Sequence, residues 1–144
     1  MAMKNYFAAL AVLAACAAAG SASAGNPTWP SSIVGTWSGT SNQSPIVLTV
    51  SSQASGSKCD VISGSIQDVN GGFSGPMSGY YCPSSGAVEF LRYPTGGNVP
   101  FQVYNANVSQ TKPPKGEGIL MGGVFSQYSL SFGPLGQYSF SLTN

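Results

Sequence analysis

The stretch CDVISGSIQDVNGGFSGPMSGYYC, residues 59–82, decides the fold, because its turn signal and its cysteines select the same hairpin register. Asn70-Gly71 is a strong signal for a two-residue type I′ turn, in which both residues adopt positive φ. A hairpin centred on this pair places Cys59 directly opposite Cys82, at a separation that a disulfide can bridge. We therefore predict an antiparallel hairpin closed by a Cys59–Cys82 disulfide, which contributes about 3 kcal/mol on the chain-entropy model.

The same register sorts the side chains of this hairpin onto two faces. The predicted core face collects Ile62, Ile66, Phe73, Met77 and Tyr81, with glycines at 64, 75 and 79 opposite bulky partners. Asp60 falls beside Tyr81 near one end of this face, and Asp68 falls beside Phe73 near the other. The second face is mostly serine, and it also carries the disulfide, which therefore lies outside the predicted core.

Short runs of alternating apolar and polar residues recur along the rest of the chain at about ten-residue spacing, which is typical of an all-β protein. They predict strands at 33–40, 46–52, 58–68, 73–82, 87–93, 101–109, 119–132 and 137–143. Because short connections make sequence neighbours spatial neighbours, we expect an up-and-down meander. The predicted fold class is an all-β antiparallel barrel of about eight strands, in a single domain of residues 33–144.

The last two predicted strands carry a near-repeat, QYSLS at 127–131 and QYSFS at 137–141. Tyr128, Leu130 and Phe132 alternate with serines in the first strand, and an equivalent apolar set follows in the second. The two sets share one face only if the connection has an odd length or contains a bulge. Gly133 or Gly136 is suited to provide it.

Residues 1–24 have the features of a bacterial secretory signal peptide: one cation, an apolar run, and Ala-Ser-Ala at 22–24. Cleavage after Ala24 would leave residues 25–32 as an N-terminal arm. Leu-Ala-Ala-Cys at 13–16 also resembles a lipobox, and an acylated Cys16 would then anchor the protein to a membrane. We expect an exported protein, periplasmic or extracellular, with an outer-membrane lipoprotein as the alternative.

Residues 25–144 contain four basic and four acidic side chains and no histidine. Without a basic patch, nucleic-acid binding is not expected. The lack of histidine argues against catalytic triads and zinc sites, and the carboxylates are too dispersed for an acid–base pair. We predict no metal, no cofactor and no enzymatic activity. Arg92 would suit an anion if it pointed inward, although a solvent-facing side chain is the expected case on this strand.

Gly35-Thr36-Trp37 opens the first predicted strand and resembles the Gly-x-Trp motif of the calycin barrels, the lipocalins and avidins. The meander of about eight strands is similar to those barrels as well. The resemblance implies a structural role for Trp37, which would close one end of the barrel. Biotin binding of the avidin type is not implied, because Trp29 and Trp37 are the only tryptophans in the chain.

The leading functional hypothesis is a barrel that binds a small apolar or amphipathic ligand, because eight strands enclose room for one such ligand or none. Phe90, Tyr93 and Tyr104 are the candidate ligand-binding residues. The first alternative is a protein-binding barrel similar to the periplasmic inhibitors of secreted metalloproteases, with Trp29 of the arm as the anchor. The second alternative is a structural or surface protein of the cell envelope.

Overall fold

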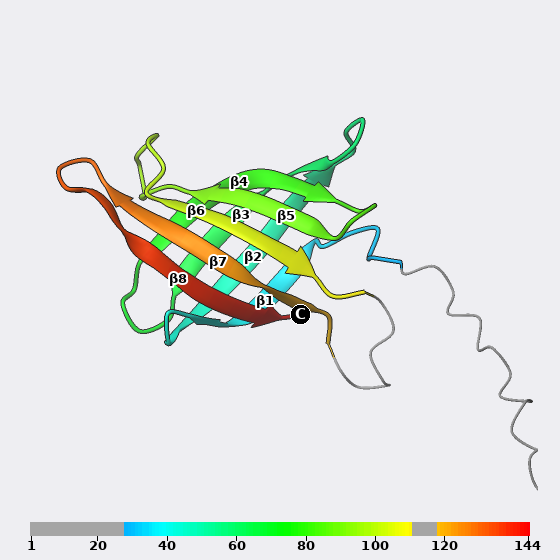
Figure 1. The fold of residues 1–144 in the computed structure, drawn as a ribbon, viewed down its shortest axis with the longest axis horizontal. Coiled ribbons are helices and arrows are strands. Elements are labelled where there is room, and N and C mark those ends of the chain that lie inside the picture. Colours follow the sequence, from blue (N-terminus) through cyan, green and yellow to red (C-terminus); the bar gives the residue numbers. More distant parts are fainter. Residues whose placement is uncertain (1–27, 111–117) are drawn as a thin grey trace, which may run out of the picture.

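The structure, a computed structural model, describes residues 28–110 and 118–144. The predicted signal peptide with Cys16, and residues 25–27 of the arm, lie outside the described residues. Within the described residues, eight antiparallel strands form a closed barrel in chain order, which confirms the predicted fold class (Figure 1). The strands are β1 (Gly35–Ser41), β2 (Ser44–Ala54), β3 (Asp60–Asp68), β4 (Ser74–Cys82), β5 (Ala87–Arg92), β6 (Gln102–Val108), β7 (Leu120–Ser129) and β8 (Gly133–Thr143).

The β3–β4 hairpin has the predicted register. Asp60 pairs with Tyr81, and a disulfide joins Cys59 to Cys82 with their Cα atoms 4.1 Å apart. On the core face, Gly79 lies opposite Ile62, and a Cβ on this glycine would come within 2.0 Å of a backbone oxygen of β5. The pairing register and the disulfide therefore agree with the predictions made from the sequence.

The conformation of the β3–β4 turn was predicted wrongly. Within this loop only Gly72 has positive φ, at 66°, so no type I′ turn forms at Asn70-Gly71. Asp68 Oδ1 instead accepts hydrogen bonds from the backbone N–H groups of Asn70 and Gly71. The register is unchanged because the longer loop has the same midpoint. The positive φ pair of a two-residue hairpin turn occurs at residues 42–43, between β1 and β2.

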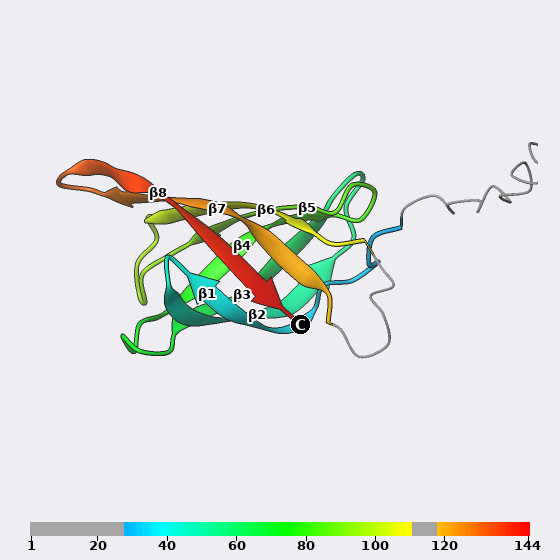
Figure 2. The ribbon, with the colours of Figure 1, turned by 60° about the horizontal axis from the view of Figure 1, so that its bottom comes forward.

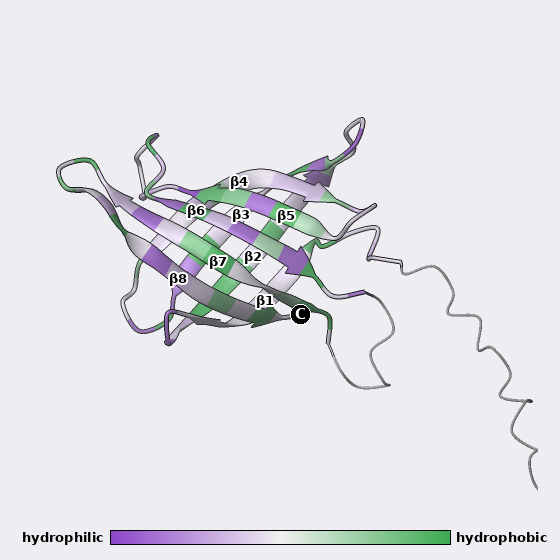
Figure 3. Cartoon of the chain, viewed as in Figure 1, coloured by the Kyte–Doolittle hydropathy of each residue, from purple (hydrophilic) through white to green (hydrophobic). Residues whose placement is uncertain are grey.

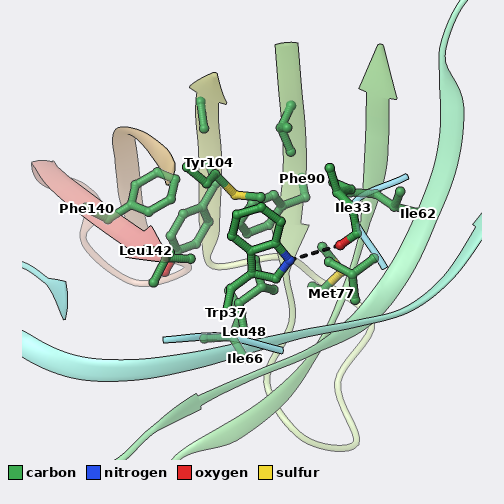
Figure 4. Packing of buried hydrophobic residues seen from close by; sticks show 14 of the residues in the cluster. Ile33, Trp37, Leu48, Ile62, Ile66, Met77, Phe90, Tyr104, Phe140 and Leu142 are labelled. Carbon is green, nitrogen blue, oxygen red and sulfur yellow. Dashed lines mark hydrogen bonds between the residues drawn. The ribbon is translucent and has the colours of Figure 1, made fainter. Parts of the chain in front are cut away.

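Apolar side chains from all eight strands fill the barrel interior, several of which are drawn in Figure 4. Figure 3 shows hydrophobic and hydrophilic residues interspersed along the strands. Tyr104 lies between Phe90 and Phe125, with ring centroids 4.5 Å and 5.0 Å away. Both ring pairs are stacked, and Phe140 meets the group edge-on. The interior of this small barrel is thus a packed core.

Phe73 is not part of this core, contrary to the prediction, since its side chain is 73% exposed. The other four residues of the predicted core face, Ile62, Ile66, Met77 and Tyr81, are buried. Phe73 lies in the loop just before β4, so its ring lies beyond the last paired residues of the hairpin, Gln67 and Ser74. Its carbonyl oxygen accepts hydrogen bonds from the Asp68 N–H and from the Arg92 side chain.

The β7–β8 hairpin departs further from expectation. The predicted bulge is present between Gln127 and Tyr128, with positive φ at Gly133 and Gly136. Strand β7 nevertheless buries Met121 and Phe125. The apolar residues of the first repeat, Tyr128, Leu130 and Phe132, are exposed instead. They continue the alternation past the point where β6 and β1 stop pairing with β7 and β8. Residues 128–136 therefore form a projecting hairpin (Figures 1 and 2).

The chain enters the barrel across its opposite end. Trp37 is 1% exposed, and its Nε1 donates a 2.9 Å hydrogen bond to the Ile33 carbonyl (Figure 4). The Tyr81 hydroxyl donates to the Pro30 carbonyl, and Gln53 binds the backbone of residues 31 and 33. Residues 30–33 are therefore held against the barrel by the buried side chains of Trp37 and Tyr81 and by the half-buried Gln53.

Alkaline pH should destabilise this end of the barrel. Burial, together with the neighbouring Asp60 carboxylate, raises the pKa of Tyr81 to about 12 from an ordinary value of 10.0. The folded state thus holds the phenolic proton more tightly than the unfolded chain does. The contribution of the protonated Tyr81 to the free energy of unfolding is therefore complete below pH 10 and is lost as the pH rises through about 12.

We expect the melting temperature, measured by circular dichroism, to fall between pH 10 and pH 12. A Tyr81→Phe variant should show a shallower fall, because it lacks the titrating group. Burial also raises the pKa of Tyr104, so part of the fall will remain in this variant. An equally steep fall in the variant would contradict the assignment to Tyr81.

Candidate functional site

One end of the barrel carries most of the exposed apolar side chains. This loop end consists of the turn at 42–43, the loops at 69–73 and 93–101, and the projecting hairpin, all on the left in Figure 1. Of the twelve large apolar residues exposed in the described part of the chain, seven lie here: Val69, Phe73, Val99, Tyr128, Leu130, Phe132 and Leu135. Exposed apolar patches of this kind mark interaction sites.

A hollow of about 310 Å³ lies at the loop end, between the 93–101 loop and the projecting hairpin. A backbone hydrogen bond of 2.8 Å, from Tyr128 N–H to the Phe101 carbonyl, ties the two segments together. The apolar part of the lining comes from Pro94, Val99, Pro100, Phe101, Tyr128 and Leu130. The volume of this hollow is at the lower end of the range for small-molecule sites.

A polar layer lies at the same end, inside the barrel wall. The buried polar side chains of the described residues are Ser41, Arg92 and Gln102, each at the loop end of its strand. Arg92 Nη1 donates to Gln102 Oε1 at 3.1 Å, and the Tyr104 hydroxyl donates to the same oxygen at 2.9 Å. The guanidinium also lies 5.3 Å from the ring centroid of Phe101, a residue that lines the hollow. One aromatic side chain therefore contacts both the buried cation and the hollow.

Arg92 points inward, so the expectation of a solvent-facing side chain was wrong. Val88, Phe90 and Arg92 alternate along β5 and are all buried, whereas Glu89 faces outward. Both acceptors of the Arg92 guanidinium, the Gln102 amide and the Phe73 carbonyl, are uncharged. Within the described part of the chain, its buried Nε has no hydrogen-bond partner. A buried cation with neutral partners is costly, and a bound anion would reduce that cost.

The structure gives the three predicted ligand-binding residues different surroundings. Phe90 and Tyr104 point into the barrel but are each 1% exposed, within the packed aromatic stack. Tyr93 is half-buried at the start of the 93–101 loop. Only the Tyr104 hydroxyl reaches the polar layer. Burial raises its pKa, which keeps this group a neutral donor.

Sequence reasoning missed Gln102 and the projecting hairpin. Gln102 and Tyr104 are two apart on β6 and so share a face, a signal that alternation could have provided. The predicted protein-binding anchor, Trp29, is half-buried. The Trp29 ring packs against Gly86: a Cβ added to this glycine would come within 2.2 Å of Trp29 Cδ1. The next residue in the chain, Pro30, is buried. The described part of the arm therefore lies on the barrel surface.

Comparison of the chain with protein-family models, curated proteins and solved structures gave no match. Within residues 28–110 and 118–144, no helix has the length and apolar character needed to cross a membrane. The same residues contain no group of three or more side chains suited to hold a metal ion. The geometry of the loop end is therefore the basis for assigning a function.

Proposed function

We propose that the protein binds a small amphipathic molecule with a negatively charged group at the loop end, without catalysing a reaction. The observation that carries this proposal is the buried Arg92, whose acceptors are neutral and whose Nε has no partner in the described chain. An acidic group would form a charge-assisted hydrogen bond with this guanidinium. The apolar hollow above it supplies the surface for the rest of the ligand.

The ligand would bind with its apolar body between the 93–101 loop and the projecting hairpin, against Val99 and Leu130. Its acidic group would reach Arg92 past the ring of Phe101, which lies over the guanidinium. The side chain of Phe101 has to turn aside for this contact. A loop is the element in which such a rearrangement costs least.

Two related fluorescent probes test this proposal. 1-Anilinonaphthalene-8-sulfonate carries an acidic group, and N-phenyl-1-naphthylamine has the same rings without it. We expect the protein to bind the sulfonate about tenfold more tightly, as one charge-assisted hydrogen bond would provide. Arg92→Met should abolish this preference while leaving binding of the neutral probe unchanged. Leu130→Ser should weaken binding of both probes.

The matched control is Val124→Ser, which removes an apolar side chain exposed on the barrel wall, away from the loop end. This variant should bind both probes like the unmodified protein. Equal affinities for the two probes, or an Arg92→Met protein that keeps the preference for the sulfonate, would refute the role of Arg92. Undiminished binding by Leu130→Ser would refute the location.

A further inference from the structure

A second hollow, of about 670 Å³, lies on the outer wall of the barrel beside the disulfide. Its floor and sides come from β4, β5 and β6, together with residues 57–59 before β3. Tyr80, Glu89 and Asn105 line it and face outward, whereas their sequence neighbours Tyr81, Phe90 and Tyr104 face the core. This outer hollow is therefore separate from the loop end and shares no residue with its lining.

The strand register places the polar and aromatic groups of the outer hollow in a defined array. Tyr80 pairs with Glu89, and Glu89 pairs with Asn105, so these side chains form a row across three strands. Two strand spacings separate Tyr80 from Asn105, which is about 10 Å. Asn107 follows two residues along β6, about 7 Å further on. The cross-strand partner of Asn107 on β5 is Ala87, whose small side chain leaves space in the outer hollow beside the Asn107 amide.

The side chains of the outer hollow combine one exposed aromatic ring with hydrogen-bonding groups. Tyr80 is 58% exposed, so most of its ring is available to a ligand. The Asn105 and Asn107 amides both donate and accept hydrogen bonds, and the Glu89 carboxylate accepts them. Lys58 and Glu89 carry opposite charges in the same lining, so the hollow does not select for a charged ligand.

We propose that the outer hollow binds a neutral carbohydrate. A sugar ring has an apolar C–H face that can stack on Tyr80, and hydroxyl groups at its edge that match the amides and the carboxylate. The row from Tyr80 to Asn105 is long enough for one to two sugar units. An apolar ligand would leave these polar groups without partners, and an anionic ligand would lie against Glu89.

Isothermal titration of the protein with cellohexaose, maltohexaose and chitohexaose tests this site. We expect at least one of these neutral hexasaccharides to bind with a Kd of about 1 mM or tighter. Tyr80→Ala should weaken that binding about tenfold, through loss of the stacked ring. Tyr80→Trp should retain it, and alanine replacing both Asn105 and Asn107 should weaken it.

Phe132→Ala is the matched control, because it removes another exposed aromatic ring, which lies in the projecting hairpin and lines neither hollow. This variant should bind the hexasaccharide like the unmodified protein. The proposal is overturned if none of the three sugars binds at about 10 mM, or if Tyr80→Ala binds as well as the unmodified protein. The naphthalene probes should not compete with the sugar, so failure of one site leaves the other test unaffected.

Discussion

Replacing Trp37 with alanine should lower the free energy of unfolding by about 3–5 kcal/mol, the range for a fully buried tryptophan. The side chain is 1% exposed inside the barrel, and its Nε1 bonds to the Ile33 carbonyl. The substitution would leave a cavity and an unpaired carbonyl together, so the expected loss is a large share of a typical domain stability. Urea unfolding followed by fluorescence and circular dichroism would measure it.

The chain contains its own control for this prediction. Trp29→Ala removes the other tryptophan, which is half-buried against Gly86, and should cost clearly less. Trp37→Phe should recover much of the loss, because it restores most of the apolar volume but not the hydrogen bond. A smaller loss at Trp37 than at Trp29 would contradict the packing described for this end of the barrel.

Removal of the Cys59–Cys82 disulfide should lower the free energy of unfolding by about 3 kcal/mol, because the unfolded chain regains the freedom of the closed loop. The two cysteines are 23 residues apart in sequence and lie just outside the paired β3 and β4 residues. A protein with both cysteines replaced by serine should therefore unfold at lower urea concentration, while keeping the barrel's circular dichroism spectrum in the absence of denaturant.

Chemical reduction of the unmodified protein provides an independent control for the disulfide. Treatment with dithiothreitol should lower the stability by the same amount as the double serine variant. A loss below about 1 kcal/mol in both experiments would show that the unfolded chain is little restrained by this bond. A helical or unfolded spectrum would instead mean that the hairpin depends on the disulfide to form.

The proposed functional roles rest on residues of two kinds. Arg92 is a buried charge that, in the proposed function, would supply a binding group at a cost in stability. Tyr80 is an exposed ring on a barrel wall that does not need it for packing. A buried arginine and an exposed tyrosine both depart from the usual placement of these residue types, and each lies at or next to a hollow. Such departures are expected at binding sites, since a fold alone requires neither.

The sequence was sufficient to predict the β3–β4 hairpin because three independent local signals agree there. The turn midpoint, the cysteine pair and the alternation of Ile62, Ile66 and Met77 with polar residues all require one register. The conformation at Asn70-Gly71 was predicted wrongly, since loops of two and four residues with one midpoint give the same pairing. For Arg92, the expectation that a strand arginine faces solvent was wrong, because Arg92 alternates with Val88 and Phe90 on the inward face of β5.

Local alternation determined the all-β class and the strands, because the period of a strand is a property of its own residues. The short connections between the strands determined that sequence neighbours pair. The tertiary structure alone decided where each strand leaves the barrel. Tyr128, Leu130 and Phe132 alternate just as core residues do. They are exposed because β6 and β1, which flank the β7–β8 hairpin in the barrel, stop pairing with it before it reaches them. The loop-end hollow and the buried surroundings of Arg92 likewise depend on segments distant in sequence, which meet only once the barrel has closed.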